Sequence, residues 1–410
     1  MDYSRTLIDE YLDFTSNHES TVRVRKWSFV SVLAGLLERR VWIPRAHYTL
    51  FPNLYVFIIG RSGLVKKSTS TSIAVNLLRE FDSVKIMSER LTARALIDQL
   101  SLSKKQFNFN GQAVNQSPVF CYASELSVFM TEVFGSLTEL LTTFYDCQPI
   151  DSNKPWTHVT HGEGTVKIFG PCLNILGAST RTWLKKCIPT SEMEGGFTSR
   201  VVFVVEEGLP DKLIAWPETS NEHDFLRGKV LKGMRRIFSL SGPMKRTEEA
   251  SKLFEKWYHF HMKEVLPFNQ DDRMSGYMSR KGDSILKLAV IRRCAADSSM
   301  TLEKEDIDWA IREMDELEPE WRLAFEKGDR PTSLTHEVYK YIKQMKKVES
   351  KALIERFSRY FPEVEIKMAL ADLEGMSQIS LFKEKKDGRD YEVAAIIGHS
   401  ISSKEAREKP

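Results

Sequence analysis

Short apolar runs alternate with amphipathic stretches through the middle of the chain. The first run, LYVFII, extends from Leu54 to Ile59 and is followed by a glycine-containing turn and a predicted helix from Ser68 to Phe81. Unbroken apolar runs of this length are typical of strands buried on both faces. Three further runs of this kind are SPVFCYAS, CLNILGAS and RVVFVVEE. Strands that alternate with helices predict a mainly parallel α/β sheet.

The sequence on both sides of this alternating region has the apolar spacing of helices. Apolar residues recur at helical spacing from Leu7 to Phe14, a second helix is expected from Trp27 to Leu37, and residues 1–50 are therefore predicted to be helical. Long helical patterns replace the strand signals beyond Asn221. They predict a helical domain over residues 216–328, beside an α/β core over residues 51–215.

Two local signals lie inside the α/β core. Thr92 precedes the segment ARALIDQL and is expected to cap a helix there. Residues 102–117 are expected to form a polar surface loop.

A small C-terminal unit is predicted after the linker sequence DRPTS. Three helices are followed by two short strands around Asp387–Gly388, a good hairpin turn signal. This order predicts a winged helix-turn-helix over residues 329–396, with a disordered tail over residues 397–410. The three helices are expected at Leu334–Met345, Lys351–Tyr360 and Val364–Glu374.

Charge and cysteine content narrow the class of protein. The formal net charge is +3, so any site for a polyanion must come from local basic clusters. Five widely spaced cysteines favour neither a zinc site nor a disulfide framework, and Cys121 and Cys172 are expected to be buried thiols in a reducing cytoplasm. No signal peptide is visible, and the apolar runs are too short to cross a bilayer, so a soluble protein without a membrane partner is expected.

The segment after Ile59 has the order that phosphate binding needs. A buried strand leads into GRSGLVKKST and then into a helix. Glycines let backbone N–H groups turn inward, a helix N-terminus adds partial positive charge, a lysine reaches the phosphates and a hydroxyl binds Mg²⁺. The predicted nucleotide-binding residues are Gly60, Ser62, Gly63, Lys66, Lys67, Ser68 and Thr69.

This loop departs from the usual GxxxxGK[ST] pattern. That pattern would place Val65 at the second glycine and Lys66 at the lysine. A loop one residue longer makes Lys67 and Ser68 the lysine–hydroxyl pair, which we prefer because it supplies a Mg²⁺ ligand. Lys66 is then a second phosphate contact. The alternative is a solvated basic turn between a strand and a helix.

Two strand ends carry candidate catalytic groups. The run VFCYASEL resembles a Walker B strand, with Ser124 where an aspartate is usual and Glu125 where a water-activating glutamate is expected. Glu125 is also the second candidate Mg²⁺ ligand, besides Ser68. Its alternative role is that of an acid stabilised by a helix N-terminus. Ser179, with Thr180, ends another strand as a candidate γ-phosphate sensor, and ordinary capping is the alternative.

The order of these motifs is similar to that in AAA+ ATPases related to minichromosome maintenance helicases. It resembles most the primase–helicase-like proteins of phages and mobile elements. The motifs that carry the resemblance are PNLYVFIIGRSGLVKKST, ASEL, LNILGASTRTWL and GGFTSR, within residues 1–325.

This resemblance implies an ATP- and Mg²⁺-dependent DNA helicase or translocase that acts in replication as a homo-hexameric ring in the cytoplasm of a bacterial host. Residues 216–328 then correspond to a lid domain. Arg200 matches an arginine finger that reaches a neighbouring subunit, because a charged fork stabilises developing phosphoryl charge. Arg280 matches a second sensor arginine. A surface role remains open for both.

Single-stranded DNA in a ring pore, duplex DNA at the winged helix and other replication proteins are the expected partners. WTHVTHGEGTVKIF is expected to form a hairpin ahead of the Ser179 strand, which in such helicases projects into the pore. A plain surface hairpin, and a protein-docking role for the C-terminal unit, are the alternatives. The candidate DNA-binding residues are Lys154, His158, His161, Lys167, Lys367, Lys385 and Lys386.

Two functions follow from these motifs. The first is a DNA helicase or translocase driven by ATP. The second is an ATP-switched, DNA-binding loader or initiator that hydrolyses slowly and does not unwind DNA, which the substituted Walker B aspartate at Ser124 favours.

Overall fold

The computed structural model divides the chain into two compact units, Met1–Phe325 and Glu326–Pro410, each with its own hydrophobic core. No helix in the described part of the chain combines the length and apolar character needed to cross a membrane. The residues described are 5–87, 92–129, 136–150, 152, 154–160, 164–187, 196–210, 212–216, 218, 220–269, 272–325, 334–358, 361–376, 378–386 and 389–396.

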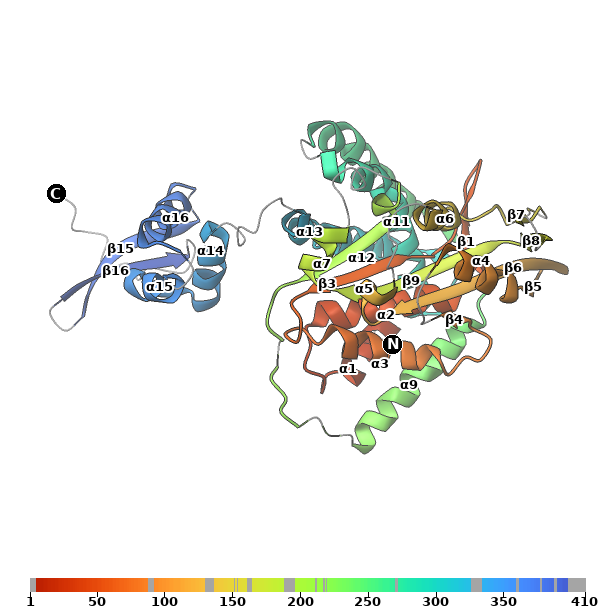
Figure 1. Cartoon of the computed structure of the whole chain (residues 1–410), viewed down its shortest axis with the longest axis horizontal. Coiled ribbons are helices and arrows are strands. Elements are labelled where there is room, and N and C mark those ends of the chain that lie inside the picture. Colours follow the sequence, from red (N-terminus) through yellow and green to blue (C-terminus); the bar gives the residue numbers. More distant parts are fainter. Residues whose placement is uncertain are drawn as a thin grey trace. The chain divides into compact units, whose positions relative to one another are not determined.

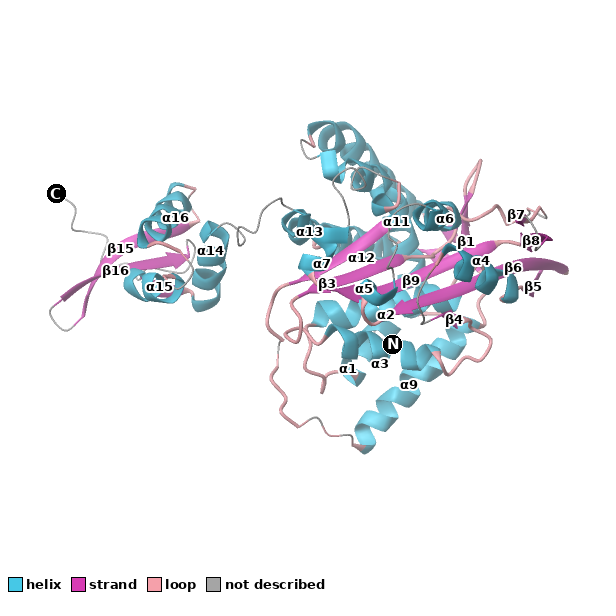
Figure 2. Ribbon diagram, viewed as in Figure 1, coloured by secondary structure: helices cyan, strands magenta, loops and turns pink. Residues whose placement is uncertain are grey.

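A twisted parallel sheet forms the centre of the first unit (Figure 2). Its strand order is β10-β3-β9-β6-β4, and all pairings along this path are parallel. Every residue of β3 and β9 is buried, as expected for strands covered on both faces. The predicted parallel α/β sheet is therefore confirmed. The strands are β10 (Val201–Glu206), β3 (Tyr55–Gly60), β9 (Pro171–Ser179), β6 (Gln112–Ala123) and β4 (Ile86–Met87).

The N-terminal helices belong to the same core as the sheet. Helix α2 (Val22–Leu37) is buried nearly all round and packs against α3, α9 and strands β3, β9 and β10. Figure 1 shows α1, α2 and α3 together on one side of the sheet. The predicted segments 1–50, 51–215 and 216–328 thus share one hydrophobic core. The other α-helices among the described residues of this unit are α1 (Leu7–Phe14), α3 (Lys67–Leu78), α4 (Ala93–Leu102), α5 (Leu126–Phe129), α6 (Ser136–Tyr145), α7 (Arg181–Cys187), α9 (Asn221–Phe238), α10 (Glu248–Phe260), α11 (Asp272–Ala296), α12 (Lys304–Asp315) and α13 (Glu318–Phe325).

Residues 38–50 differ from the helical prediction for the N-terminal region. Helix α2 ends where Glu38 adopts φ 53°, and the chain continues into β1 (Val41–Pro44) and β2 (Thr49–Leu50). Strand β1 pairs with β2 and also with the two-residue strand β11 (Gly242–Pro243). Strand β11 lies in the region that was predicted to be entirely helical. Tertiary pairing creates these short strands, and a helical period does not reveal it. The remaining short strands are β11 (Gly242–Pro243), β12 (Lys245–Arg246) and β13 (Thr301–Leu302).

The prediction of a polar loop over residues 102–117 was wrong. Strand β5 (Lys105–Phe109) and the start of β6 form an antiparallel hairpin there. Asn110 and Gly111 turn the chain with φ of 50° and 80°. Asn-Gly is the strongest short hairpin signal because both turn residues need positive φ. The polar composition of the flanking strands concealed it.

The described residues of the second unit form three helices and a three-stranded antiparallel sheet with order β14-β16-β15. Helices α14, α15 and α16 and the paired strands β15 and β16 follow one another in the predicted order, and the structure adds the short strand β14. Its turn at Asp387–Gly388 and the predicted tail over 397–410 lie outside the described residues. The elements are α14 (Leu334–Met345), β14 (Lys347–Glu349), α15 (Ser350–Phe357), α16 (Glu363–Gly375), β15 (Ile379–Lys386) and β16 (Arg389–Ile396).

Candidate functional site

The loop between β3 and α3 turns sharply at two positions. Gly63 has φ 75° and Lys66 has φ 47°, conformations in which backbone N–H groups turn away from the strand direction. No side chain caps the start of α3, and its first turn carries no acidic residue. The positive end of the helix is therefore left for an external anion.

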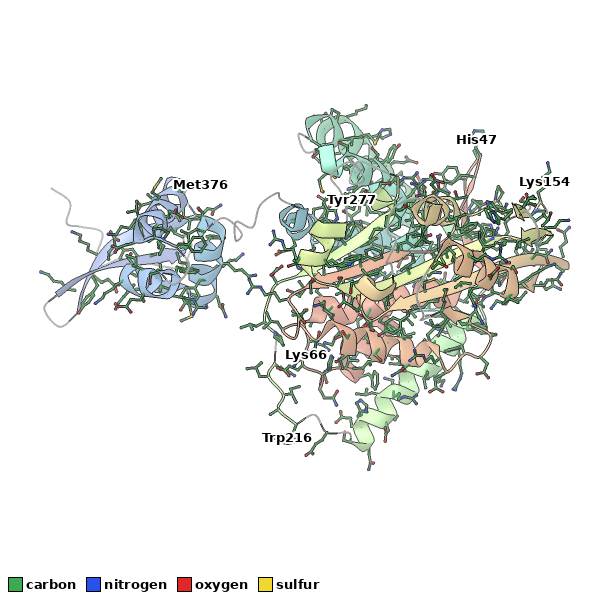
Figure 3. All side chains as sticks on the ribbon, viewed as in Figure 1. His47, Lys66, Lys154, Trp216, Tyr277 and Met376 are labelled. Carbon is green, nitrogen blue, oxygen red and sulfur yellow. The ribbon has the colours of Figure 1, made fainter. Side chains whose placement is uncertain are left out.

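The structure distinguishes the two adjacent lysines. Lys67 is buried, and its Nζ donates hydrogen bonds to the carbonyl oxygens of Gly60 at 2.8 Å and Arg61 at 3.0 Å. Lys66 is exposed, and its Nζ lies 3.9 Å from Oε2 of Glu19 (Figure 3). The loop therefore encloses Lys67 and directs Lys66 outward.

Two acidic side chains at this edge of the sheet affect the pKa of Lys67. Burial lowers the pKa of its ammonium group, and the nearby carboxylates of Glu125 and Glu207 oppose that shift. A buried ammonium held by backbone carbonyls can exchange those carbonyls for phosphate oxygens, since it needs strong acceptors.

Glu125 lies at the same edge of the sheet, held by hydroxyl groups. The Oγ of Ser179 donates to Glu125 Oε1 at 2.9 Å, and that of Ser127 donates to the same oxygen at 3.2 Å. Strand pairing explains the proximity, because Ala123 of β6 pairs with Gly177 of β9 and each lies two residues before one of these groups. Thr180 instead caps α7, accepting from the backbone N–H of Trp183 at 3.2 Å.

Ser68 joins the loop to the end of β6. Its Oγ donates to the carbonyl oxygen of Ser124 at 3.4 Å, and both residues are exposed. A hydroxyl at a helix start and a carboxylate across from it are oxygen ligands of the kind that Mg²⁺ takes beside phosphates. Exposed Ser62, Gly63 and Thr69 complete an open face. The residues present therefore fit a Mg²⁺-bound triphosphate.

Gly60 ends β3 in a crowded position. A Cβ atom there would lie 2.5 Å from the carbonyl oxygen of Glu206 and 2.9 Å from Cγ2 of Val65. Val65 itself is fully buried, which accounts for a branched residue where the usual pattern has a second glycine. The loop is anchored by Val65 packing inward.

Arg200 and Arg280 meet at the opposite edge of the sheet. Arg200 precedes Val201, whose partner is Tyr55 at the start of β3, so it lies at the amino ends of the strands. Its Nη2 donates to Asp146 Oδ2 at 2.5 Å, and Arg280 Nη1 donates to Asp146 Oδ1 at 3.2 Å. No sequence motif points to Asp146, because only folding brings α6, α11 and β10 together.

The candidate DNA-binding hairpin forms as predicted, from β7 (Trp156–Thr160) and β8 (Gly164–Ile168). Its candidate residues do not share one face, however. Lys167 is exposed opposite Thr157, whereas His158 lies on the other face and stacks on Trp156 with ring centroids 5.8 Å apart. Lys154 is exposed just before β7 (Figure 3). The candidate His161 lies outside the described residues.

The basic candidates of the second unit lie on helix α16 and at the end of strand β15. Lys367 on α16 is paired with Glu363 of the same helix at 2.6 Å, and Glu363 raises the pKa of the lysine. Lys385 is exposed on β15. Lys386 ends that strand, and its side chain lies outside the described part. Lys367 is thus partly neutralised by its own helix.

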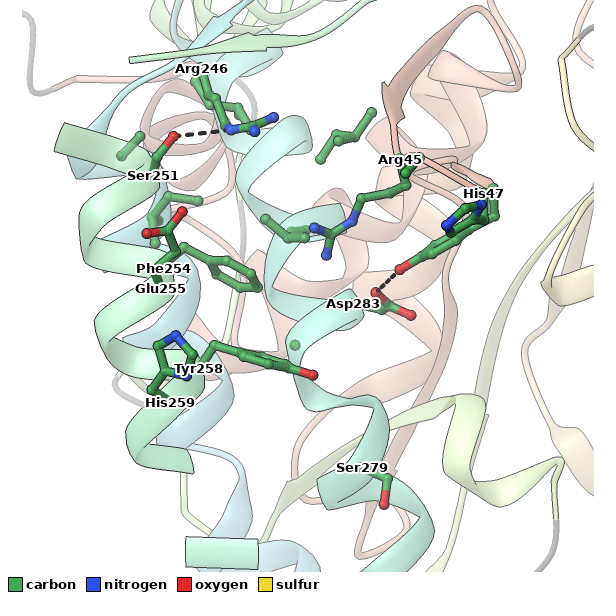
Figure 4. A pocket seen from close by; sticks show the side chains of 18 residues that line it. Arg45, His47, Arg246, Ser251, Phe254, Glu255, Tyr258, His259, Ser279 and Asp283 are labelled. Carbon is green, nitrogen blue, oxygen red and sulfur yellow. Dashed lines mark hydrogen bonds between the residues drawn. The ribbon is translucent and has the colours of Figure 1, made fainter. Parts of the chain in front are cut away.

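A cavity of about 530 Å³ lies away from these groups, between the β1–β2 turn and helices α10 and α11 (Figure 4). Phe254 and Tyr258 line it together with Arg45 and Arg246. None of the predicted nucleotide-binding residues is among its lining residues. The residues that line the cavity lie far apart in the sequence, so no sequence motif predicted it.

Fold and site together define a mixed α/β protein with a candidate phosphate-binding loop at the carboxyl edge of a parallel sheet. No protein-family model and no curated protein matches the chain. One similar solved structure is a full-length MCM homologue from Methanopyrus kandleri, with a TM-score of 0.37 and 14% sequence identity. The match covers 71% of this chain and 55% of that one, so the chain spans little more than half of its length.

Proposed function

We propose that this protein is a P-loop ATPase that uses ATP to translocate on or unwind DNA. The observation that carries the proposal is the convergence of Lys67, Glu125 and Ser179 at one edge of the sheet, beside an uncapped helix start. The pairing of Ser179 with Glu125, the electrostatic coupling of Glu125 to Lys67, and the hydrogen bond from Ser68 to Ser124 support it.

Each group has a distinct part in this proposal. Amides of the loop and the Lys67 ammonium bind the β- and γ-phosphates. Ser68 and Glu125 would hold Mg²⁺, which neutralises charge on the phosphates when bound. Glu125 orients the attacking water, and Ser179 fixes the carboxylate and senses the γ-phosphate. Lys66, directed toward Glu19, supplies at most an outer contact.

Arg200 and Arg280 are proposed to act on the nucleotide of a neighbouring copy. Arg200 lies at the amino end of β10 and is linked to Arg280 through Asp146, whereas the phosphate loop follows the carboxyl end of β3, so the two arginines lie at the edge opposite their own loop. A head-to-tail arrangement of this kind forms a ring when the rotation between copies closes, and an open filament otherwise. A homo-hexamer is the assembly we propose.

The outer parts of the protein are proposed to handle DNA. The β7–β8 hairpin, with Lys154 and Lys167 exposed, would contact single-stranded DNA in the pore. The second unit, with three helices and a hairpin, is proposed to be a winged helix. Residues 216–328 are proposed as the lid. Phage or mobile-element replication is the proposed context.

A second candidate is a DNA-binding loader or initiator that hydrolyses ATP slowly. Ser124, exposed where an aspartate would hold Mg²⁺, favours it. Strand displacement on forked DNA, measured with ATP and Mg²⁺ against the Glu125→Gln variant as the inactive control, separates the two. Displacement by the wild type alone supports the helicase. ATP turnover without displacement supports the loader, and no turnover contradicts both.

A further inference from the structure

We infer that Asp146 is a positioning residue that holds Arg200 and Arg280 as a pair for the phosphates of a neighbouring copy of this chain. The inference rests on the proposed function and adds to it a residue that no motif identifies. Asp146 follows α6, whereas Arg200 precedes β10 and Arg280 lies in α11. Three segments far apart in sequence therefore meet at one carboxylate.

The carboxylate divides its two oxygens between the two arginines. Oδ2 accepts from Arg200 Nη2 at 2.5 Å, and Oδ1 accepts from Arg280 Nη1 at 3.2 Å. The carbonyl oxygen of Gly196 accepts from the other terminal nitrogen of Arg200 at 2.5 Å. Hydrogen bonds to charged groups are the stronger and more directional kind. Asp146 thus fixes both the separation and the direction of the two guanidinium groups.

The cluster stays positively charged after this pairing. Two guanidinium groups meet one carboxylate, and the Lys287 ammonium lies 3.6 Å from the ring centre of neighbouring Tyr145. Each arginine has five N–H donors. The hydrogen bonds described use two from Arg200 and one from Arg280. Charge and donors remain for a polyanion.

The three side chains of the cluster differ in their exposure to solvent. The side chains of Asp146 and Arg280 are 51% and 35% exposed, whereas that of Arg200 is 7% exposed. A polyanion arriving from outside therefore meets Arg280 and Asp146 first. Arg200, held beneath them, is aligned by the carboxylate before any neighbour arrives. Such preorganisation lowers the cost of binding a developing charge.

The phosphates cannot come from the same copy. Strand β10 separates Arg200 from the carboxyl edge, a span of roughly 20 Å at the usual rise per strand residue. Glu206, at the far end of β10, pairs with Gly60 at the start of the phosphate loop. A second copy must present its own loop to the Asp146 cluster.

Complementation between variants tests this placement. In mixed assemblies, Lys67→Ala damages the loop side of each interface, and Asp146→Asn should damage the arginine side. Each head-to-tail interface takes its loop side from one copy and its arginine side from the next. In an equal, random mixture of these two variants, about a quarter of the interfaces therefore have both sides undamaged. Asp146→Asn mixed with Arg200→Ala regenerates none, since both defects lie on one side.

The expected result is a loss of about tenfold in ATP turnover for Asp146→Asn with unchanged ATP affinity, as fits loss of preorganisation alone. Turnover should return on mixing with Lys67→Ala but not with Arg200→Ala. Asp146→Glu, which keeps the carboxylate, should recover part of the rate, and thermal unfolding confirms that each variant folds.

Two outcomes would overturn the inference while leaving the proposed ATPase intact. One is recovery of turnover when Asp146→Asn is mixed with Arg200→Ala. The other is no recovery with Lys67→Ala under conditions where Arg200→Ala and Lys67→Ala do complement each other. A wild-type protein without ATP turnover overturns the proposed function, and this inference with it.

Discussion

The hydroxyl of Ser179 donates a 2.9 Å hydrogen bond to the carboxylate of Glu125, across two neighbouring parallel strands that end at the sheet edge carrying the candidate phosphate-binding loop. The bond restricts the direction of Glu125 Oε1. A carboxylate that must orient a water molecule benefits from such restraint.

Removing the Glu125 carboxylate should remove catalysis but not folding. We expect Glu125→Gln to lower kcat for ATP hydrolysis by about 100-fold or more, the usual scale for a missing general base. Ser179→Ala should cost about tenfold, because the carboxylate remains but is less restrained. Steady-state ATP turnover measures both.

Thr180→Ala is the matched control for Ser179→Ala. Thr180 caps α7 and so contributes about 1 kcal/mol to stability. Its removal should lower Tm and leave kcat near the wild-type value. Equal losses of kcat in Ser179→Ala and Thr180→Ala would argue that Ser179 has only a structural role.

His18 links the pH dependence of stability to the helix that begins at the loop. Its Nε2 lies 3.0 Å from Oγ of Ser70, and burial lowers the pKa of the imidazole below its ordinary value, helped by the charge of Arg25. Between the lowered pKa and about 6.5 the unfolded chain binds more protons, so stability rises with pH there. His18→Gln should remove that rise.

Thermal unfolding of both proteins at about pH 5 and about pH 7.5 measures the effect, since the imidazole titrates in this range. The wild type should gain more Tm between the two pH values than the variant does. An equal gain in both would show that His18 does not contribute.

Gly60 should not tolerate a side chain. Gly60→Ala drives a methyl group against the Glu206 carbonyl and Val65, and overpacking of this kind costs about 1–3 kcal/mol. Gly228→Ala is the control: no atom lies within 4 Å of the added Cβ in helix α9, and alanine should stabilise the helix by about 0.5–1 kcal/mol. Urea unfolding reports both, and a neutral Gly60→Ala would contradict the packing described.

The exposed lysines of the hairpin should contribute to binding of single-stranded DNA. We expect Lys154→Ala with Lys167→Ala to weaken binding and to reduce the slope of log affinity against log salt by about 0.7 for each phosphate that is no longer neutralised. Lys252→Ala, an exposed lysine on α10, is the control and should change neither quantity. An unchanged slope in the double variant would exclude the hairpin from the DNA path.

Much of the fold was predictable because its strands are unbroken apolar runs. Strands β3, β9 and β10 and the second half of β6 follow from their apolar runs, and parallel pairing then brings Glu125 and Ser179 to the edge that carries the loop. The short strands β1, β2 and β11 were not predictable, because each has only two to four residues and depends on a distant partner.

The sequence offered candidate site residues only in the loop and at the ends of the predicted strands. Lys67 is buried at the start of α3, whereas Lys66 precedes the helix with φ 47° and is exposed. The choice of Lys67 as the phosphate-binding lysine stays a prediction. Asp146 could not be found in this way. Its role depends on two arginines that lie 54 and 134 positions away.

Equilibrium binding of ATP in the presence of Mg²⁺, measured by calorimetry on the wild type, Lys67→Ala and Lys66→Ala, tests the phosphate loop most directly. The wild type should bind one nucleotide per chain, Lys67→Ala should bind at least about tenfold more weakly, and Lys66→Ala should bind almost as the wild type does, because a buried charge-assisted hydrogen bond contributes more than an exposed one. Undiminished binding by Lys67→Ala, or no binding by the wild type, would contradict a nucleotide site between Gly60 and Thr69.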